Sequence, residues 1–272
     1  MLNNEKDQQQ MLAESVTAWR DVWLIEITGG PSIECPTCAD YQYIDLTHNF
    51  WPALINGVLG QTGYNKFDYV GFSNGCRVAL DALATGEINP NKVDTFVGVG
   101  CPGAFEGVST VKTAFIARGN SAVKKLRDAG LKHTSFTQAL QGLFPFYQIY
   151  PDGTSKISVN LFDQYVEWAS SSQDQQPAEG LSIDNFNVIY GKISPFSDGA
   201  VTVTDNEAIF DNVNADEGKL MRIGGAPHGG IGSAISSLIL PEHVVTRYLI
   251  EWRVNNDSSM EFGTQPYIAG TK

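Results

Sequence analysis

One pentapeptide has the residue types and the spacing for nucleophilic chemistry: Gly71-Phe72-Ser73-Asn74-Gly75, a G-x-S-x-G pattern. It follows a predicted buried strand, residues 67–73, and opens a predicted helix, residues 74–85. A sharp turn between strand and helix favours glycine on both sides, because a side chain would clash there. The turn would lift the serine hydroxyl above the sheet edge, where the helix N-terminus favours developing negative charge. We therefore predict Ser73 as a nucleophile; the alternative is a plain turn with an incidental serine.

A serine hydroxyl is a weak nucleophile at neutral pH and needs an adjacent base. His228 lies in the glycine-rich loop 225–230, directly after a predicted strand, residues 219–225. This position is at the carboxyl end of a strand, the same edge of the sheet as Ser73, so His228 is the predicted base. The other three histidines fit less well: His48 precedes the serine, His133 lies in a helical block, and His243 has apolar neighbours in the last helix.

The acid that orients the base should lie between the serine and the histidine, after a strand. Asp198 follows the predicted strand 185–191 in a tight turn, about 30 residues before His228. That interval leaves room for one helix or loop and one strand. Asp205 and Asp211 are competitors, and we prefer Asp198 because the residues before Asp205 lead away from the turn. Its carboxylate would hold the imidazole tautomer and stabilise the imidazolium.

The composition is that of a globular domain, with 42% hydrophobic and 18% charged residues in 272. A net charge of -12 disfavours nucleic acid and anionic membranes as partners. No apolar stretch approaches the length of a transmembrane helix. The first ten residues lack the apolar core of a secretory signal, so the sequence predicts a cytoplasmic protein unless its natural start lies elsewhere. It predicts no oligomeric state.

Strands and helices alternate along the first 103 residues and again after residue 184, which predicts an α/β fold with a mostly parallel sheet and helices on both faces. Strands are expected at 21–28, 67–73, 93–100, 185–191 and 219–225, and helices at 6–20, 45–63, 74–85 and 235–254. Amphipathic stretches at 110–129, 134–143 and 159–171 indicate a helical insertion over 104–184. Its apolar run contains Phe144 and Phe146, which could line a substrate pocket or pack the insertion onto the core. Phe72 and Phe196 are further pocket candidates.

Two groups of segments, DVWLIEI with TGYNKFDYVGFSNG, and SDGAV with APHGG, resemble the lipase and carboxylesterase branch of the α/β-hydrolase superfamily. The likeness spans roughly residues 10–103 and 185–253. It implies triad roles for Ser73, Asp198 and His228, an oxyanion donor in the backbone N–H of Asn74, and an insertion that caps the acyl pocket. The implied organisation is a core of 1–103 and 185–272 with a cap of 104–184. The implied reaction is hydrolysis of carboxylic esters with short to medium acyl chains, with no metal or organic cofactor.

The sequence departs from this family at the second oxyanion donor, which the family takes from a loop after an earlier strand. Either the chain begins late and another segment supplies the donor, or Gly29 or Gly30 supplies it from the loop after residues 21–28. Losing one donor lowers the rate about 100- to 1000-fold. The same triad also serves acyltransferases, thioesterases and amidases, and an incomplete oxyanion site would suit a non-catalytic binding protein.

The four cysteines give weaker indications. Cys35 and Cys38 form a lone CxxC pair, for which we prefer a structural loop over a redox pair or half of a zinc site. Cys76, on the helix after the pentapeptide, is expected to be a small buried apolar residue.

Overall fold

The computed structural model describes residues 20–25, 40–103, 107, 109–135, 156–171, 178–192, 200–225, 241–256 and 258–272. Within these residues the strands are β1 (Phe67–Phe72), β2 (Val93–Val99), β3 (His133–Ser135), β4 (Lys156–Ser158), β5 (Asn185–Lys192), β6 (Lys219–Gly224) and β7 (Ile268–Thr271). The α-helices are α2 (Tyr43–Asp45), α3 (Trp51–Thr62), α4 (Asn74–Ala84), α5 (Thr110–Asp128), α7 (Val159–Ser171), α8 (Val203–Asn212), α10 (Pro241–Asn255) and α11 (Glu261–Thr264). A π-helical segment, η1 (Leu46–Phe50), joins α2 to α3, and short 3-10 turns are η2 (Pro90–Lys92), η3 (Ser258–Met260) and η4 (Gln265–Tyr267).

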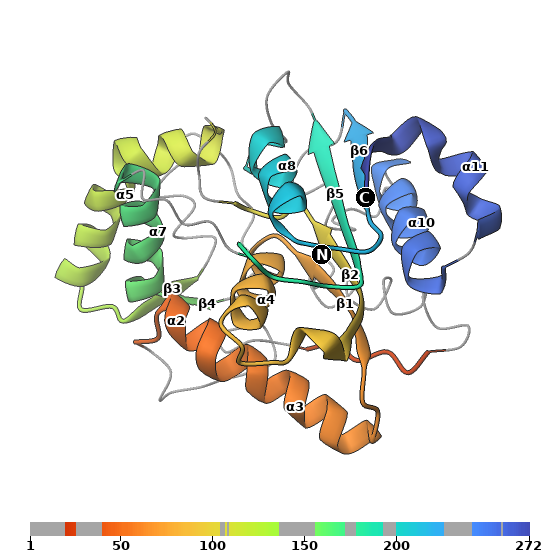
Figure 1. The fold of residues 1–272 in the computed structure, drawn as a ribbon. Helices are drawn as coiled ribbons and strands as arrows, with labels where there is room; N and C mark the ends of the chain where they lie inside the picture. Colours follow the sequence, from red (N-terminus) through yellow and green to blue (C-terminus); the bar gives the residue numbers. More distant parts are fainter. Residues whose placement is uncertain are drawn as a thin grey trace.

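The central sheet has five strands in the order β1-β2-β5-β6-β7 (Figure 1). The first four are parallel, and β7 pairs antiparallel with β6. The four parallel strands are the apolar runs expected from the sequence, because a strand covered on both faces needs apolar residues on both sides. The predicted α/β class with a mostly parallel sheet is confirmed.

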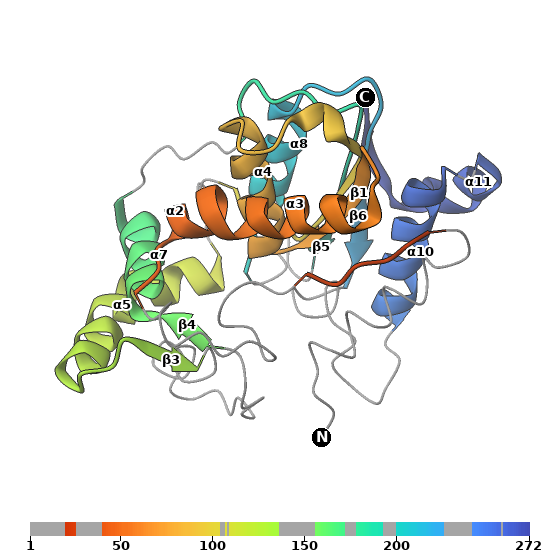
Figure 2. The same ribbon diagram turned by 90° about the horizontal axis from the view of Figure 1, so that it is seen from below.

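Helices cover both faces of the sheet, as Figures 1 and 2 show, with α3, α4 and α8 on one side and α10 on the other. Alternate residues of each strand therefore enter different cores. In β1, Tyr69 belongs to the core beneath α4, whereas Val70 and Phe72 pack against the core beneath α10. In β5, Val188 faces the first core and Ile189 the second.

The chain between β2 and β5 contains α5, α7 and the antiparallel pair of β3 and β4. Both views place α5 and α7 together at one end of the molecule (Figures 1 and 2). The two helices lie so close together that a Cβ on Gly119 of α5 would be 2.5 Å from a methyl carbon of Val166 on α7. The expected helices at 110–129 and 159–171 are confirmed.

Two expected elements are wrong where the structure describes them. Residues 20–25 form no strand: Trp23 and Leu24 are exposed at 42% and 46%, so this apolar run is not covered on both faces. Thr134 and Ser135 belong to strand β3 rather than to a helix, because they pair with β4. The predicted helix 6–20 lies outside the described residues except for Arg20, and 26–28 and 136–143 lie outside them altogether.

Several elements were not predicted, namely strands β4 and β7, the short helix α11 and helix α8. The start of α8 has a capping box, in which the Thr202 side chain accepts from the backbone of Asp205 and the Asp205 side chain accepts from the backbone of Thr202. None of the described helices combines the length and the apolarity needed to cross a membrane.

Candidate active site

The turn between β1 and α4 holds Ser73 in a backbone conformation that only a constrained residue adopts. Its φ is 49° and its ψ is -121°, outside the regions ordinarily open to a residue with a side chain. Its N–H donates to the carbonyl of Val99 at 2.8 Å, and its carbonyl accepts from the N–H of Cys76 at 3.0 Å. Ser73 is partly exposed. The strand–turn–helix context expected for the pentapeptide is confirmed.

The two glycines of the pentapeptide differ in what they do. A Cβ on Gly71 would lie 2.7 Å from a ring carbon of Tyr69 and 2.8 Å from the Cα of Cys76, so the turn admits no side chain there. A Cβ on Gly75 would meet nothing closer than the Tyr69 hydroxyl at 3.8 Å, an ordinary contact. The expectation of a clash is therefore wrong for Gly75, whose carbonyl instead accepts a hydrogen bond of 3.0 Å from that hydroxyl.

The carboxyl ends of the parallel strands meet at one edge of the sheet. Phe72 is paired with Val99 at the ends of β1 and β2, and Lys192 with Gly224 at the ends of β5 and β6. Ser73 and the segments that follow Lys192 and Gly224 thus leave the sheet at the same edge. Those segments contain Asp198 and His228, which lie outside the described residues, so their meeting with Ser73 stays a prediction.

Asp205 and Asp211, the two alternatives to Asp198 as the acid, both lie on α8. The carboxylate of Asp205 accepts from the Thr202 hydroxyl at 2.6 Å and from the Thr202 N–H at 3.3 Å, and the residue is buried. It is therefore engaged in capping α8. Asp211 is exposed near the end of the same helix.

The three other histidines lie on elements that the structure describes. His48 lies on η1 with its Nδ1 2.6 Å from a carboxylate oxygen of Glu87, on the surface. His133 is exposed in β3. His243 lies on α10, as predicted.

Asn74 has a partner that the sequence did not reveal. It is the first residue of α4, where backbone N–H groups have no carbonyl of their own helix to bond. Its side-chain oxygen accepts a 2.7 Å hydrogen bond from the hydroxyl of Tyr165 on α7. The two residues are 91 positions apart, and no local spacing indicates the pair.

Next to this contact, Arg77 of α4 is buried among aromatic rings. Its guanidinium lies 4.7 Å from the ring centre of Trp168 and 5.4 Å from that of Tyr43, and its Nη1 donates to the Gly103 carbonyl at 2.8 Å. The hydroxyl of Tyr43 donates to Asp81 at 2.6 Å. Burial raises the pKa of Asp81, and the Arg77 charge opposes that rise. In the sequence, a single arginine in the mostly apolar helix 74–85 could have indicated this buried cation.

The first turn of α4 is also joined to the segment that follows β2 by a disulfide between Cys76 and Cys101, whose Cα atoms are 5.5 Å apart. Both residues are fully buried. The prediction that Cys76 is a buried helix residue is confirmed, but its partner was missed. Space for the two sulfurs comes from Gly98, where a Cβ would lie 2.7 Å from one and 3.0 Å from the other.

The remaining pocket predictions are largely untested. Phe72 packs against the core beneath α10 with part of its surface. Outside the described residues lie Gly29, Gly30, Cys35, Cys38, Phe144, Phe146 and Phe196.

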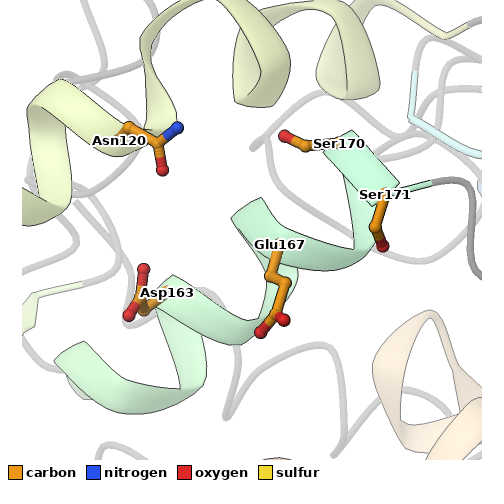
Figure 3. A pocket seen from close by; sticks show the side chains of 5 residues that line it. All are labelled: Asn120, Asp163, Glu167, Ser170 and Ser171. Atoms are coloured by element: carbon orange, nitrogen blue, oxygen red, sulfur yellow. The ribbon is translucent and has the colours of Figure 1, made fainter.

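Elsewhere on the surface, α5 and α7 border a pocket of about 390 Å³ lined by Asn120, Asp163, Glu167, Ser170 and Ser171 (Figure 3). Asn120 comes from α5 and the other four residues from α7, and none of them was predicted as a site residue. Among the described residues, no cluster of three or more His, Cys, Asp or Glu could hold a metal ion.

No protein-family model matches the sequence, and a search of curated proteins finds no match. Solved structures do match over most of their length. An esterase from Exiguobacterium antarcticum has a TM-score of 0.58 at 12% identity, covering 91% of this chain and 87% of its own. A monoacylglycerol lipase from Paleococcus ferrophilus has a TM-score of 0.56 at 14% identity, covering 92% and 88%. A meta-cleavage product hydrolase from Pseudomonas fluorescens has a TM-score of 0.53 at 12% identity, covering 92% and 85%. With this sheet and its covering helices, the chain has the α/β-hydrolase fold.

Proposed function

We propose that this protein is a serine hydrolase that cleaves carboxylic esters, with Ser73 as nucleophile, His228 as base and Asp198 as the acid that orients the base. The observation that carries the proposal is the constrained Ser73 turn, at the carboxyl edge of a parallel sheet and at the start of α4. A strained backbone held by its surroundings is typical of functional sites. The esterase and the lipase among the solved structures with this fold support the same reaction class.

The reaction would proceed by two acyl transfers. His228 takes the proton from the Ser73 hydroxyl as the oxygen attacks the ester carbonyl, and then gives it to the leaving alcohol. The resulting acyl-enzyme is attacked by water, which loses its proton to His228. As the bond from the acyl carbon to the Ser73 oxygen breaks and the acid is released, His228 returns that proton to Ser73. Asp198 would keep the imidazole in the required tautomer. No metal or organic cofactor enters these steps.

The negative charge on the carbonyl oxygen would be stabilised by backbone N–H groups. Asn74 supplies the first, because it is the first residue of α4. We assign the second to Gly29 or Gly30. In support, Arg20, at the start of the segment that leads toward these glycines, contacts the carboxylate of Asp68 in β1 with its side chain.

We propose that the insertion, residues 104–184, forms the cap of the substrate site. The support is its place in the chain, since it leaves the sheet directly after β2, next to the nucleophile strand. Phe144 and Phe146 would line an apolar pocket, together with Phe72 and Phe196. Such a lining fits esters with short to medium acyl chains.

Covalent labelling with a fluorophosphonate probe tests the nucleophile. Wild-type protein should be labelled once per chain, and Ser73→Ala should not be labelled. The matched control is Ser170→Ala, which removes an exposed serine hydroxyl on α7 and should leave labelling unchanged. Undiminished labelling of Ser73→Ala would exclude the proposed nucleophile, and an unlabelled wild type would favour a non-catalytic binding protein.

Steady-state rates on p-nitrophenyl esters of increasing acyl length, matched thioesters and anilides then separate ester hydrolysis from thioesterase and amidase activity. His228→Ala should lose at least about 1000-fold in kcat. His48→Ala, on a surface pair with Glu87, is its control. Asp198→Asn should fall by a similar factor, whereas Asp211→Asn on the exposed face of α8 should not.

A further inference from the structure

The insertion makes direct contact with the nucleophile turn through one hydrogen bond. The hydroxyl of Tyr165, on α7, donates to the side-chain oxygen of Asn74 at 2.7 Å. Asn74 follows the predicted nucleophile directly, and its backbone N–H is the first oxyanion donor of the proposed function. A residue 91 positions away is thus attached to the residue that carries this donor.

The hydrogen bond lies between two helix faces that pack against each other. On α4, Asn74, Arg77 and Asp81 follow one another at helical spacing and share a face. On α7, Tyr165 and Trp168 share a face, and their rings pack edge to face with centres 5.7 Å apart. Arg77 lies 4.7 Å from the Trp168 ring, so the two faces dock beside the hydrogen bond.

The direction of the hydrogen bond runs from Tyr165 to Asn74. Burial raises the pKa of Tyr165 well above that of a free tyrosine, so its hydroxyl keeps the proton that it donates. The Asn74 amide therefore presents its oxygen to α7. Because the first N–H groups of a helix have no carbonyl one turn earlier in the helix to bond, an anchored side chain adds a restraint on how far that turn can rotate.

We propose that Tyr165 is a positioning residue for the oxyanion site: through the Asn74 side chain it holds the Asn74 N–H at the place where the carbonyl oxygen develops its charge. This inference rests on the proposed function. Oxyanion donors contribute most when they are fixed before the reaction, so loosening one should lower turnover more than substrate binding.

The test is a double-mutant cycle of Tyr165→Phe and Asn74→Ala, with kcat and KM measured on a p-nitrophenyl ester. Tyr165→Phe should lower kcat about 2- to 12-fold, the factor for one ordinary hydrogen bond, with KM nearly unchanged. In the Asn74→Ala background the same substitution should have no further effect, because the hydroxyl has lost its acceptor. The matched control is Tyr43→Phe, which removes a neighbouring hydroxyl that bonds Asp81 instead; its kcat should equal that of wild type.

The outcomes separate this inference from the proposed function. An active wild type with an unchanged Tyr165→Phe variant would overturn the positioning role alone. So would an equal loss in both backgrounds, which would indicate a structural effect. A wild type that neither hydrolyses esters nor reacts with the fluorophosphonate would overturn the proposed function and the positioning role together. The urea unfolding cycle of the same four proteins would then report whether the contact exists, as a non-additive change in the unfolding constant of about twofold or more.

Discussion

Removing the Cys76–Cys101 disulfide should destabilise the protein by an amount that the length of the loop it closes predicts. The bond joins residues 25 positions apart. In the chain-entropy model, cross-linking a loop of this size lowers the conformational entropy of the unfolded chain, which stabilises the folded state by about 3.5 kcal/mol. Each cysteine is fully buried, so replacing it by alanine adds roughly 1 kcal/mol for the missing sulfur.

These terms make different contributions to the single and double variants. Cys76→Ala and Cys101→Ala each lose the cross-link, so each should lower the free energy of unfolding by about 4.5 kcal/mol. The double variant loses the cross-link only once and should fall by about 5.5 kcal/mol. The double change is therefore smaller than the sum of the single changes by about 3.5 kcal/mol, which is the contribution of the bond alone.

The assay is urea unfolding at equilibrium, followed by tryptophan fluorescence, for all four proteins. A parallel series with excess dithiothreitol is the control, because reduction of the unfolded chain removes the cross-link from wild type and the non-additivity should vanish. Additive single changes without reductant would refute the reasoning, since they would mean that the two sulfurs are not joined in solution.

Two other comparisons test how the turn and the core are built. Gly71→Ala should cost at least about 2 kcal/mol and abolish fluorophosphonate labelling, because its Cβ would lie 2.8 Å from the Cα of Cys76, whereas Gly75→Ala should be neutral or slightly stabilising in urea unfolding. Arg253 is buried and donates to the side-chain oxygens of two asparagines in β5, so Arg253→Met should lose about 2 to 4 kcal/mol by the same measurement. Arg247→Met, which breaks a surface pair with Glu251 on α10, should change stability by less than about 0.5 kcal/mol.

The sheet and the turn that holds Ser73 could be predicted from the sequence because local patterns determine them. Four apolar runs between polar or glycine-containing turns form the parallel strands, at 67–72, 93–99, 185–192 and 219–224. Such short apolar runs are typical of strands that helices cover on both faces. The turn at Ser73 could be predicted because a glycine is required at position 71, where a Cβ would lie 2.8 Å from the Cα of Cys76. Helix α8 was not predicted, although Thr202 and Asp205 have the three-residue spacing of a capping box.

The contacts that hold the turn were not readable, because they join residues that only the tertiary fold brings together. Cys76 meets Cys101 because α4 lies across the end of β2, and Tyr165 meets Asn74 because α7 docks on α4. The strand expected at 21–28 does not form over the described residues 21–25, where the local pattern indicated a burial that the fold does not provide. Its apolar residues suggested burial, but Trp23 and Leu24 face solvent, and apolar composition alone does not decide which surface is covered.

Tyr69 links the turn to the pH dependence of stability. Its hydroxyl donates to the Gly75 carbonyl, and burial raises its pKa to about 12. Between pH 10 and pH 12 the folded protein therefore keeps a proton that the unfolded chain has lost, so stability is fully present below pH 10 and falls as pH rises toward 12. A shift of this size corresponds to a loss on the order of 2 to 3 kcal/mol. Urea unfolding across this range should show a smaller decline for Tyr69→Phe than for wild type; equal declines would mean that the Tyr69 hydroxyl ionises as freely in the fold as in the open chain.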